Sequence, residues 1–176
     1  MSDASGTRFA GARARMALLV AGVVLCVVVV VGAGIEWGRL LVNGRLVVIE
    51  DGLSLWQGVV VLIAAAAGAL AMALSVAASR GRPAALAALA SGVVITVVSI
   101  QALVWLVTRP DAIAAQVKAG AEAIPLTGYV VPPIESVLGP GGWMALAAGI
   151  LLLMLGLVAL VVPAWRGRTG ATRSSG

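Results

Sequence analysis

Side chains that can act as nucleophiles, proton carriers or metal ligands are few in this sequence. It contains one cysteine, Cys26, within an apolar run, and no histidine. A single cysteine cannot form an intrachain disulfide or a Cys-x-x-Cys redox pair, and the lack of histidine disfavours most metal sites. P-loop, His-Glu-x-x-His and Gly-x-Ser-x-Gly spacings are also missing. We therefore predict a protein that is not an enzyme and that has no catalytic residue, no metal and no cofactor.

Carboxylates are the remaining candidates for acid–base chemistry. Six of the seven acids fall in two polar segments between apolar runs: Glu36, Glu50, Asp51, Asp111, Glu122 and Glu135. Paired carboxylates can transfer protons to and from a substrate, but scattered acids in polar segments are typical of solvated surfaces. The apolar runs contain no charged residue, which disfavours a proton relay or an ion-coupled transporter.

The elements that carry these residues are predicted membrane spans. Hydrophobic residues make up 61% of the 176 residues and charged residues 11%, and the mean hydropathy is +1.11. This composition is typical of membrane proteins. Runs of about 20 residues, rising about 1.5 Å per residue in a helix, match a hydrocarbon layer about 30 Å thick. The expected spans are residues 16–35, 55–78, 84–107 and 143–164.

The predicted fold is therefore an all-α membrane protein, a four-transmembrane-helix bundle with a small extracytoplasmic cap made of a β-hairpin and an amphipathic helix. The formal net charge is +5, which could indicate a nucleic-acid partner. The basic residues, however, fall at the ends of apolar runs rather than in one patch. This distribution of charge predicts that the protein associates with the lipid bilayer and not with nucleic acid.

Orientation follows from a short connector, residues 79–83, which contains Arg80 and Arg82 between two apolar runs. Short loops rich in arginine stay on the cytoplasmic side. Residues 1–15 and 165–176 are then cytoplasmic tails, and this side holds eight of the twelve basic residues but one acid. The composition resembles that of a high-GC bacterium. We predict a bacterial plasma (inner) membrane protein with both termini cytoplasmic.

A cleaved signal peptide is the alternative for the first span. Its basic start and its Gly32-Ala33-Gly34 sequence mimic the layout of a secretory signal. The apolar core is, however, longer than the roughly 7–15 residues typical of such signals. We therefore expect the first span to be retained.

Two segments are predicted to lie outside the bundle, residues 36–54 and 108–142. In the first, Asn43-Gly44 separates two apolar runs rich in β-branched residues, which predicts a β-hairpin with a type I′ turn. A loop in the lipid headgroups is the alternative. In the second, Thr108 before Pro110 predicts the start of a separate amphipathic helix, followed by a short strand at residues 127–131. We expect these elements to dock into one cap.

Small residues at helical spacing predict the faces through which the spans pack, because small faces let helix backbones approach closely in lipid. The second span offers Ala65, Gly68, Ala69 and Ala73, the third Gly92, Thr96 and Ser99, and the last Gly149 and Gly156. The faces of the second and third spans are expected to pack on each other. A polar conduit built from Ser91, Thr96, Ser99 and Gln101 is the alternative use of the third span.

The five tryptophans all lie at predicted span ends. They are Trp37, Trp56, Trp105, Trp143 and Trp165. Indole rings prefer the membrane–water interface, so we interpret them, together with Arg80 and Arg82, as topology and interface anchors. A ligand-stacking cluster formed by the first four is the alternative.

The layout also carries a family resemblance. The basic tail, the span ending near Trp37, the sequence Leu53-Ser54-Leu55-Trp56-Gln57-Gly58 and the turn at Ser79-Arg80-Gly81-Arg82 resemble the actinobacterial tryptophan-biosynthesis-associated membrane proteins. That family implies a membrane location and a link to aromatic metabolism. A coarser architectural likeness is to claudin-type four-helix membrane proteins, which carry a β-rich first external loop.

From these observations the expected function is that of an accessory, assembly or interaction subunit of a larger membrane complex, with a membrane protein as its partner. The alternative is a small-molecule transporter or binding subunit linked to aromatic metabolism. Substantial external structure and uncharged spans favour the first function.

Overall fold

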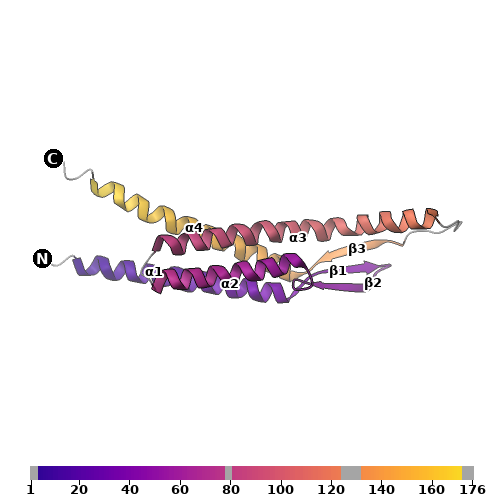
Figure 1. The fold of residues 1–176 in the computed structure, drawn as a ribbon, viewed down its shortest axis with the longest axis horizontal. Helices are drawn as coiled ribbons and strands as arrows, with labels where there is room; N and C mark the ends of the chain where they lie inside the picture. Colours follow the sequence, from indigo (N-terminus) through magenta and orange to yellow (C-terminus); the bar gives the residue numbers. More distant parts are fainter. Residues whose placement is uncertain (1–3, 78–80, 124–131, 172–176) are drawn as a thin grey trace.

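The computed structural model describes residues 4–77, 81–123 and 132–171 (Figure 1). The described chain is mostly helical and carries a small three-stranded sheet. The helices are α1 Ala4–Gly34, α2 Trp56–Ala77, α3 Gly81–Ala123 and α4 Pro140–Ala171. The strands are β1 Glu36–Val42, β2 Arg45–Asp51 and β3 Ile134–Leu138.

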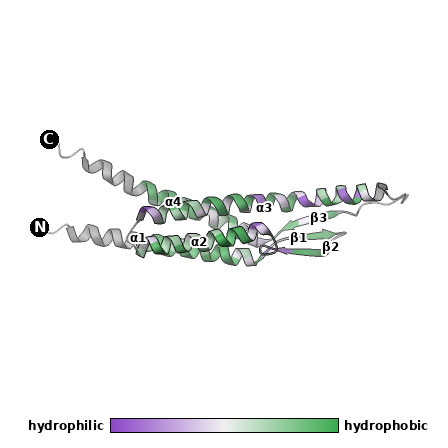
Figure 2. Cartoon of the chain, viewed as in Figure 1, coloured by the Kyte–Doolittle hydropathy of each residue, from purple (hydrophilic) through white to green (hydrophobic). Residues whose placement is uncertain are grey.

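The four helices form an antiparallel bundle. Helix α1 packs against α2 and α4, and α3 packs against the same two helices, so each helix occupies one corner. In the described chain all four are long and apolar enough to cross a membrane (Figure 2). The apolar windows are Met16–Gly34, Trp56–Ser75, Arg82–Gly120 and Pro140–Val161.

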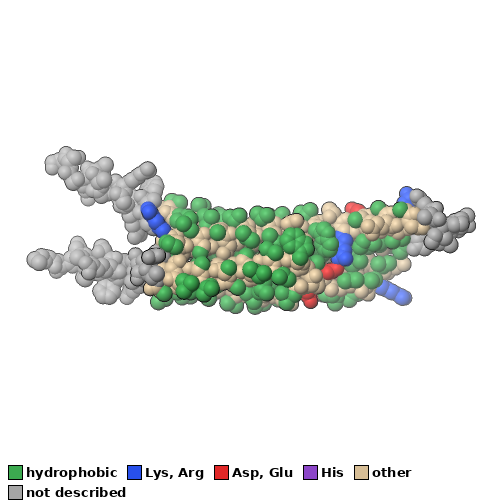
Figure 3. Space-filling model, in the orientation of Figure 1, with side chains coloured by type: hydrophobic (Ala, Val, Ile, Leu, Met, Phe, Trp, Pro, Cys, Tyr) green, Lys and Arg blue, Asp and Glu red, His purple; other side chains and the backbone are tan. Residues whose placement is uncertain are grey.

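The outer surface of the bundle is as apolar as its interior. Large exposed side chains cover it, including Val24 on α1, Leu70 on α2 and Val97 on α3. Figure 3 shows hydrophobic side chains over the bundle, with charged ones near its two ends. A soluble monomer rarely exposes apolar patches of this extent. The bundle surface therefore suits lipid, in agreement with the four helices of the described chain that are long and apolar enough to cross a membrane.

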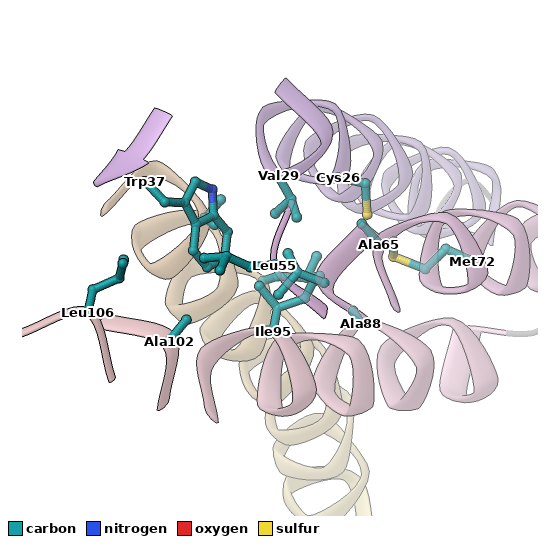
Figure 4. Packing of buried hydrophobic residues seen from close by; sticks show 14 residues of the cluster. Cys26, Val29, Trp37, Leu55, Ala65, Met72, Ala88, Ile95, Ala102 and Leu106 are labelled. Atoms are coloured by element: carbon teal, nitrogen blue, oxygen red, sulfur yellow. The ribbon is translucent and has the colours of Figure 1, made fainter. Parts of the chain in front are cut away.

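The core contains small residues, branched aliphatic residues and one large aromatic ring. Cys26 and Val29 of α1, Ala65 of α2 and Ile95 of α3 converge in its middle (Figure 4). The fully buried Trp37 of β1 belongs to the same cluster, at the end of the bundle where the sheet begins. The hydrophobic core thus continues from the bundle into the base of the sheet.

The sheet has the order β2-β1-β3 with both pairs antiparallel. Asn43 and Gly44 have φ values of 53° and 70°, as a type I′ turn requires, and the predicted hairpin is confirmed. Strand β3, from the second external segment, pairs with β1 through Gly38↔Leu138 to Val42↔Ile134. The two segments predicted outside the bundle therefore share one sheet.

The prediction of a separate amphipathic helix starting at Thr108 is wrong. Helix α3 runs without interruption from Gly81 to Ala123, with Pro110 inside it. The Thr108 hydroxyl does not cap a new helix but donates to the carbonyls of Val104 and Trp105 in its own helix. A proline inside a helix costs about 3 kcal/mol, and packing of α3 against β3 offsets this cost.

Several element boundaries also differ from those expected. The third strand lies at Ile134–Leu138, whereas the strand predicted at residues 127–131 lies outside the described residues. Gly81, Arg82 and Pro83 already belong to α3, and proline is well tolerated in a first helical turn. Helices α1 and α4 continue into the segments expected to be tails, beginning at Ala4 and ending at Ala171.

Candidate functional site

The sheet is joined to the bundle by a tightly packed junction around Trp37. The Trp37 Nε1–H donates to the carbonyl oxygen of Gly32, 2.9 Å away, and its ring is fully buried. Gly139 N–H donates to the carbonyl of Trp37 over 2.7 Å. Because both the side chain and the backbone of Trp37 are bound, the strand leaves α1 in a fixed direction.

Glycines make the close approach at this junction possible. A Cβ at Gly141 would lie 2.6 Å from the Gly32 carbonyl oxygen, and a Cβ at Gly52 would collide with the Trp37 indole and the Ala33 carbonyl. No side chain fits at either position. The end of β2 and the start of α4 are thus packed directly against the end of α1.

The turn from β2 into α2 is held by local hydrogen bonds. Ser54 N–H donates to Asp51 Oδ1 over 2.6 Å, and the Ser54 hydroxyl donates to the Asp51 carbonyl over 2.8 Å. Asp and Ser favour such side chain–backbone bonds in turns. This turn places Gln57 inside the bundle, where it is buried.

An ion pair braces the sheet against the outer half of α3. The guanidinium of Arg109 donates from Nη1 to Oε1 of Glu50 on β2. The same guanidinium lies 4.6 Å from the centre of the Trp105 ring, within the range of a cation–π contact. A Cβ at Gly38 of β1 would lie 3.3 Å from the side chain of Leu106. Strand β1 therefore also approaches α3 closely, about one helical turn before Arg109.

A second ion pair lies on the exposed surface of β1. Arg39 Nε donates to Glu36 Oε1 over 2.5 Å. The Glu36 carboxylate raises the pKa of Arg39 above its ordinary value, mainly by accepting this hydrogen bond and also through its charge. Glu36 and Glu50 are therefore each paired with an arginine.

Among the described residues no group of three or more His, Cys, Asp or Glu side chains could hold a metal ion.

Strand β2 is the most exposed part of the sheet. Leu46, Val47, Val48 and Ile49 are all exposed, although they are consecutive and apolar. Strand β3, by contrast, alternates between half-buried and exposed residues because α3 covers one of its faces. The structure thus presents an exposed apolar strand whose position is fixed by the Glu50–Arg109 ion pair and by the Trp37 junction.

The small-residue positions predicted for helix packing are placed mainly between α3 and α4. A Cβ at Gly149 would lie 2.8 Å from Ile95 and 3.0 Å from Thr96 Oγ1, and a Cβ at Gly156 would lie 2.6 Å from Leu89 N. Gly92 contacts Leu153 of α4, so it does not face α2 as expected. Gly68 of α2 contacts Ser91 of α3.

The alanines of α2 do not form one contact stripe. Ala65 is fully buried, Ala69 is half-buried and Ala73 is exposed. Each step of four residues turns about 40° beyond a full helical turn, so positions at strict i+4 spacing rotate away from a contact. The buried positions of α2 instead include Val61, Ala65, Gly68 and Met72, at mixed spacings of three and four.

The polar residues of α3 do not line one path. Ser99 is fully buried and Thr96 is half-buried, whereas Gln101 is exposed on the bundle surface. In the described chain the buried side-chain atoms without a hydrogen-bond partner are Gln57 Oε1, Thr96 Oγ1 and Ser99 Oγ. Sequence reasoning missed Gln57, although an amide at the start of an apolar span is a signal that could have identified it.

The tryptophans serve different purposes. Trp37 is buried in the core, so its interpretation as an interface anchor is wrong: its indole is held by protein atoms rather than by the membrane interface. Trp56, Trp105 and Trp143 are exposed, as anchors would be. Trp165 lies in α4 beyond the described side chains, Arg82 is exposed, and Arg80 lies outside the described residues.

Comparison with protein-family models, curated proteins and solved structures finds no match to this chain. The resemblance to tryptophan-biosynthesis-associated membrane proteins and the claudin-like layout therefore stay predictions.

Proposed function

We propose that this protein is a non-enzymatic accessory subunit of the bacterial plasma membrane, which anchors a rigid external platform that binds a membrane-protein partner. The platform consists of the three strands and the outer part of α3. In this proposal both termini of the protein lie on the cytoplasmic side, because the arginine-rich segments are at the opposite end of the bundle from the sheet.

The observation that carries the proposal is the exposure of β2. Four consecutive apolar side chains remain uncovered on a strand that projects beyond the end of α2 (Figure 1). The Glu50–Arg109 pair and the Trp37 junction hold this strand in place. A surface that is both apolar and rigid loses little conformational entropy on binding, which favours a protein partner.

Native purification tests this function. Wild-type protein and a variant with Leu46, Val47 and Ile49 replaced by threonine are extracted from the source membrane in mild detergent and purified. We expect one membrane protein to co-purify in fixed stoichiometry with the wild type and to be lost from the variant, whose β-propensity is preserved by threonine. Recovery of the wild type without any partner would contradict the proposal.

A second candidate function, a small-molecule transporter or binding subunit, is favoured by the buried atoms Gln57 Oε1, Thr96 Oγ1 and Ser99 Oγ. Polar groups without partners inside a bundle can bind a polar solute. Reconstituted vesicles would then take up a solute, with aromatic compounds tested first. Substituting Ser99 by alanine should abolish uptake, while Gln101→Leu, at an exposed position, should not. An accessory subunit would show no uptake in any variant.

A further inference from the structure

Strand β2 forms an open edge of the sheet. In the order β2-β1-β3 its outer side has no neighbouring strand among the described residues. The other edge strand, β3, lies against α3. An edge strand offers unpaired backbone N–H and C=O groups to any other extended chain.

The usual protections of such an edge are sparse on β2. Its apolar run, Leu46 to Ile49, contains no proline and no charge. Within this run the pairing has a bulge, where the register with β1 passes from Leu40↔Val48 to Leu41↔Leu46 and skips Val47; a second register shift lies at the bundle end, between Glu36↔Asp51 and Gly38↔Glu50. Charged residues occur only at the two ends, with Arg45 beside the hairpin turn and Glu50 and Asp51 beside the bundle.

Lipid and a second copy in the same membrane are both disfavoured as occupants. The hairpin extends along the bundle axis beyond the end of α2 and beside the outer part of α3, which carries the charged residues Arg109, Asp111 and Lys118 (Figure 1). A symmetric pair of two β2 strands would be antiparallel. Since β2 runs from the hairpin tip toward its own bundle, the bundle of a second copy would lie at the far end of the joined sheet.

We infer that β2 binds an extended segment of a partner protein as an added antiparallel strand, with an acidic residue opposite Arg45 and a basic residue opposite Asp51. This inference rests on the proposed function and specifies its mode of recognition, in which backbone hydrogen bonds supply affinity and side chains supply specificity.

Charge complementarity supports this orientation. Arg45 is exposed, and it forms no salt bridge with any described residue. Glu50 is engaged by Arg109, whereas the exposed Asp51 at the opposite end of the strand accepts a hydrogen bond from Ser54 N–H through Oδ1 but forms no salt bridge with any described residue. Opposite charges directly across two strands stabilise their pairing, and like charges destabilise it. Opposite Val47, Val48 and Ile49 the partner segment must be apolar.

A peptide with the sequence of β2 itself, Arg-Leu-Val-Val-Ile-Glu-Asp, is a suitable probe. In an antiparallel alignment its aspartate lies opposite Arg45 and its arginine lies opposite Asp51. Capped at both ends and fluorescently labelled, it is titrated against the full chain in nanodiscs, with empty nanodiscs as the reference. We expect saturable binding to the protein-containing discs. Equal binding to empty discs would overturn the inference, because lipid would then be the occupant.

Matched peptides test the orientation and the backbone contacts. Exchanging the terminal arginine and aspartate keeps the composition, and we expect about fivefold to tenfold weaker binding. Backbone N–H groups of a strand point alternately to its two edges. Two further peptides therefore carry N-methyl groups at alternate positions, each blocking one edge. Only the peptide whose blocked edge faces β2 should lose binding. Equal binding by all of these peptides would show that β2 is contacted by its side chains alone.

Variants of the protein locate the site. Val47 and Val137 are similarly exposed, at 58% and 52%, but Val137 lies on β3. Val47→Lys should weaken peptide binding at least tenfold, and Val137→Lys should leave it unchanged. Equal loss in both variants would overturn the inference. So would a dimer of the full chain that Val47→Lys dissociates, because the occupant would then be a second copy.

The proposed function and this inference fail differently. If the native partner co-purifies equally well with Val47→Lys, the partner binds elsewhere, so strand addition is wrong and the accessory function stands. If no partner co-purifies with the wild type, the accessory function itself is wrong.

Discussion

Glu50 on β2 accepts a hydrogen bond from Arg109 on α3, although 59 residues separate the two in the sequence. The pair is the charged link between the strand with the most exposed side chains and the longest helix. It lies partly buried, with 14% of the Glu50 side chain and 33% of the Arg109 side chain exposed. The pair therefore couples the orientation of the hairpin to the outer part of α3.

A double-mutant cycle on this pair tests the coupling. Glu50→Gln and Arg109→Gln should each destabilise the protein by about 1–3 kcal/mol, because the remaining charge is left partly buried without its partner. The double variant should recover part of this loss. Thermal unfolding in detergent measures the change. The matched control is Glu36–Arg39, where 53% of the arginine side chain is exposed, and its removal should have no measurable effect.

Substitution of Trp37 tests the junction between sheet and bundle. Trp37→Phe should cost about 1–3 kcal/mol, because it removes the indole donor from the buried Gly32 carbonyl, which keeps only the longer bond from Ile35 N–H. Trp37→Ala should cost about 3–5 kcal/mol through the cavity that it creates. Thermal unfolding in detergent is the readout, and Trp56→Phe, on an exposed ring, is the control. Equal stability of Trp37→Phe and the wild type would show that the indole hydrogen bond is dispensable.

Much of the fold could be predicted from local patterns. The length and hydropathy of four runs indicated the helices, and Asn43-Gly44 indicated the hairpin because a type I′ turn depends on two adjacent residues. The continuity of α3 could not be predicted in this way. Thr108 and Pro110 form a sound local helix start, and the contacts that accompany a single continuous helix are with strands distant in the sequence.

The candidate site was less accessible to sequence reasoning, because its parts depend on register. Nothing in the sequence pairs Glu50 with Arg109 until β2, β1 and α3 are placed beside one another. Trp37 looked like an interfacial tryptophan because the same residue type serves both at membrane interfaces and in cores. The exposure of β2 was equally hidden, since it depends on β3 pairing with the other side of β1.

Glycine substitutions test the contact between α3 and α4. Gly92→Ala would place its Cβ 2.7 Å from Leu153 Cα, and this overpacking should destabilise the protein by about 1–3 kcal/mol. Gly120 is the matched control in the same helix, because a Cβ there meets nothing within 4 Å. Gly120→Ala should stabilise the protein by up to about 1 kcal/mol through its better helix propensity. Unfolding in detergent compares the two, and equal effects would contradict the close packing of α3 on α4.

Cysteine labelling tests the orientation of the chain and the extent of α3 together. Cys26 is replaced by serine, and single cysteines are introduced as Arg45→Cys, Lys118→Cys and Arg82→Cys. The hairpin and the outer end of α3 lie at one end of the bundle, and the start of α3 lies at the other (Figure 1). We expect a membrane-impermeant maleimide to label positions 45 and 118 in intact cells, and position 82 only after permeabilisation, because the arginine-rich end is cytoplasmic.

Labelling of position 82 alone in intact cells would reverse the orientation. Labelling of 45 and 118 from opposite sides would show that α3 does not extend beside the sheet.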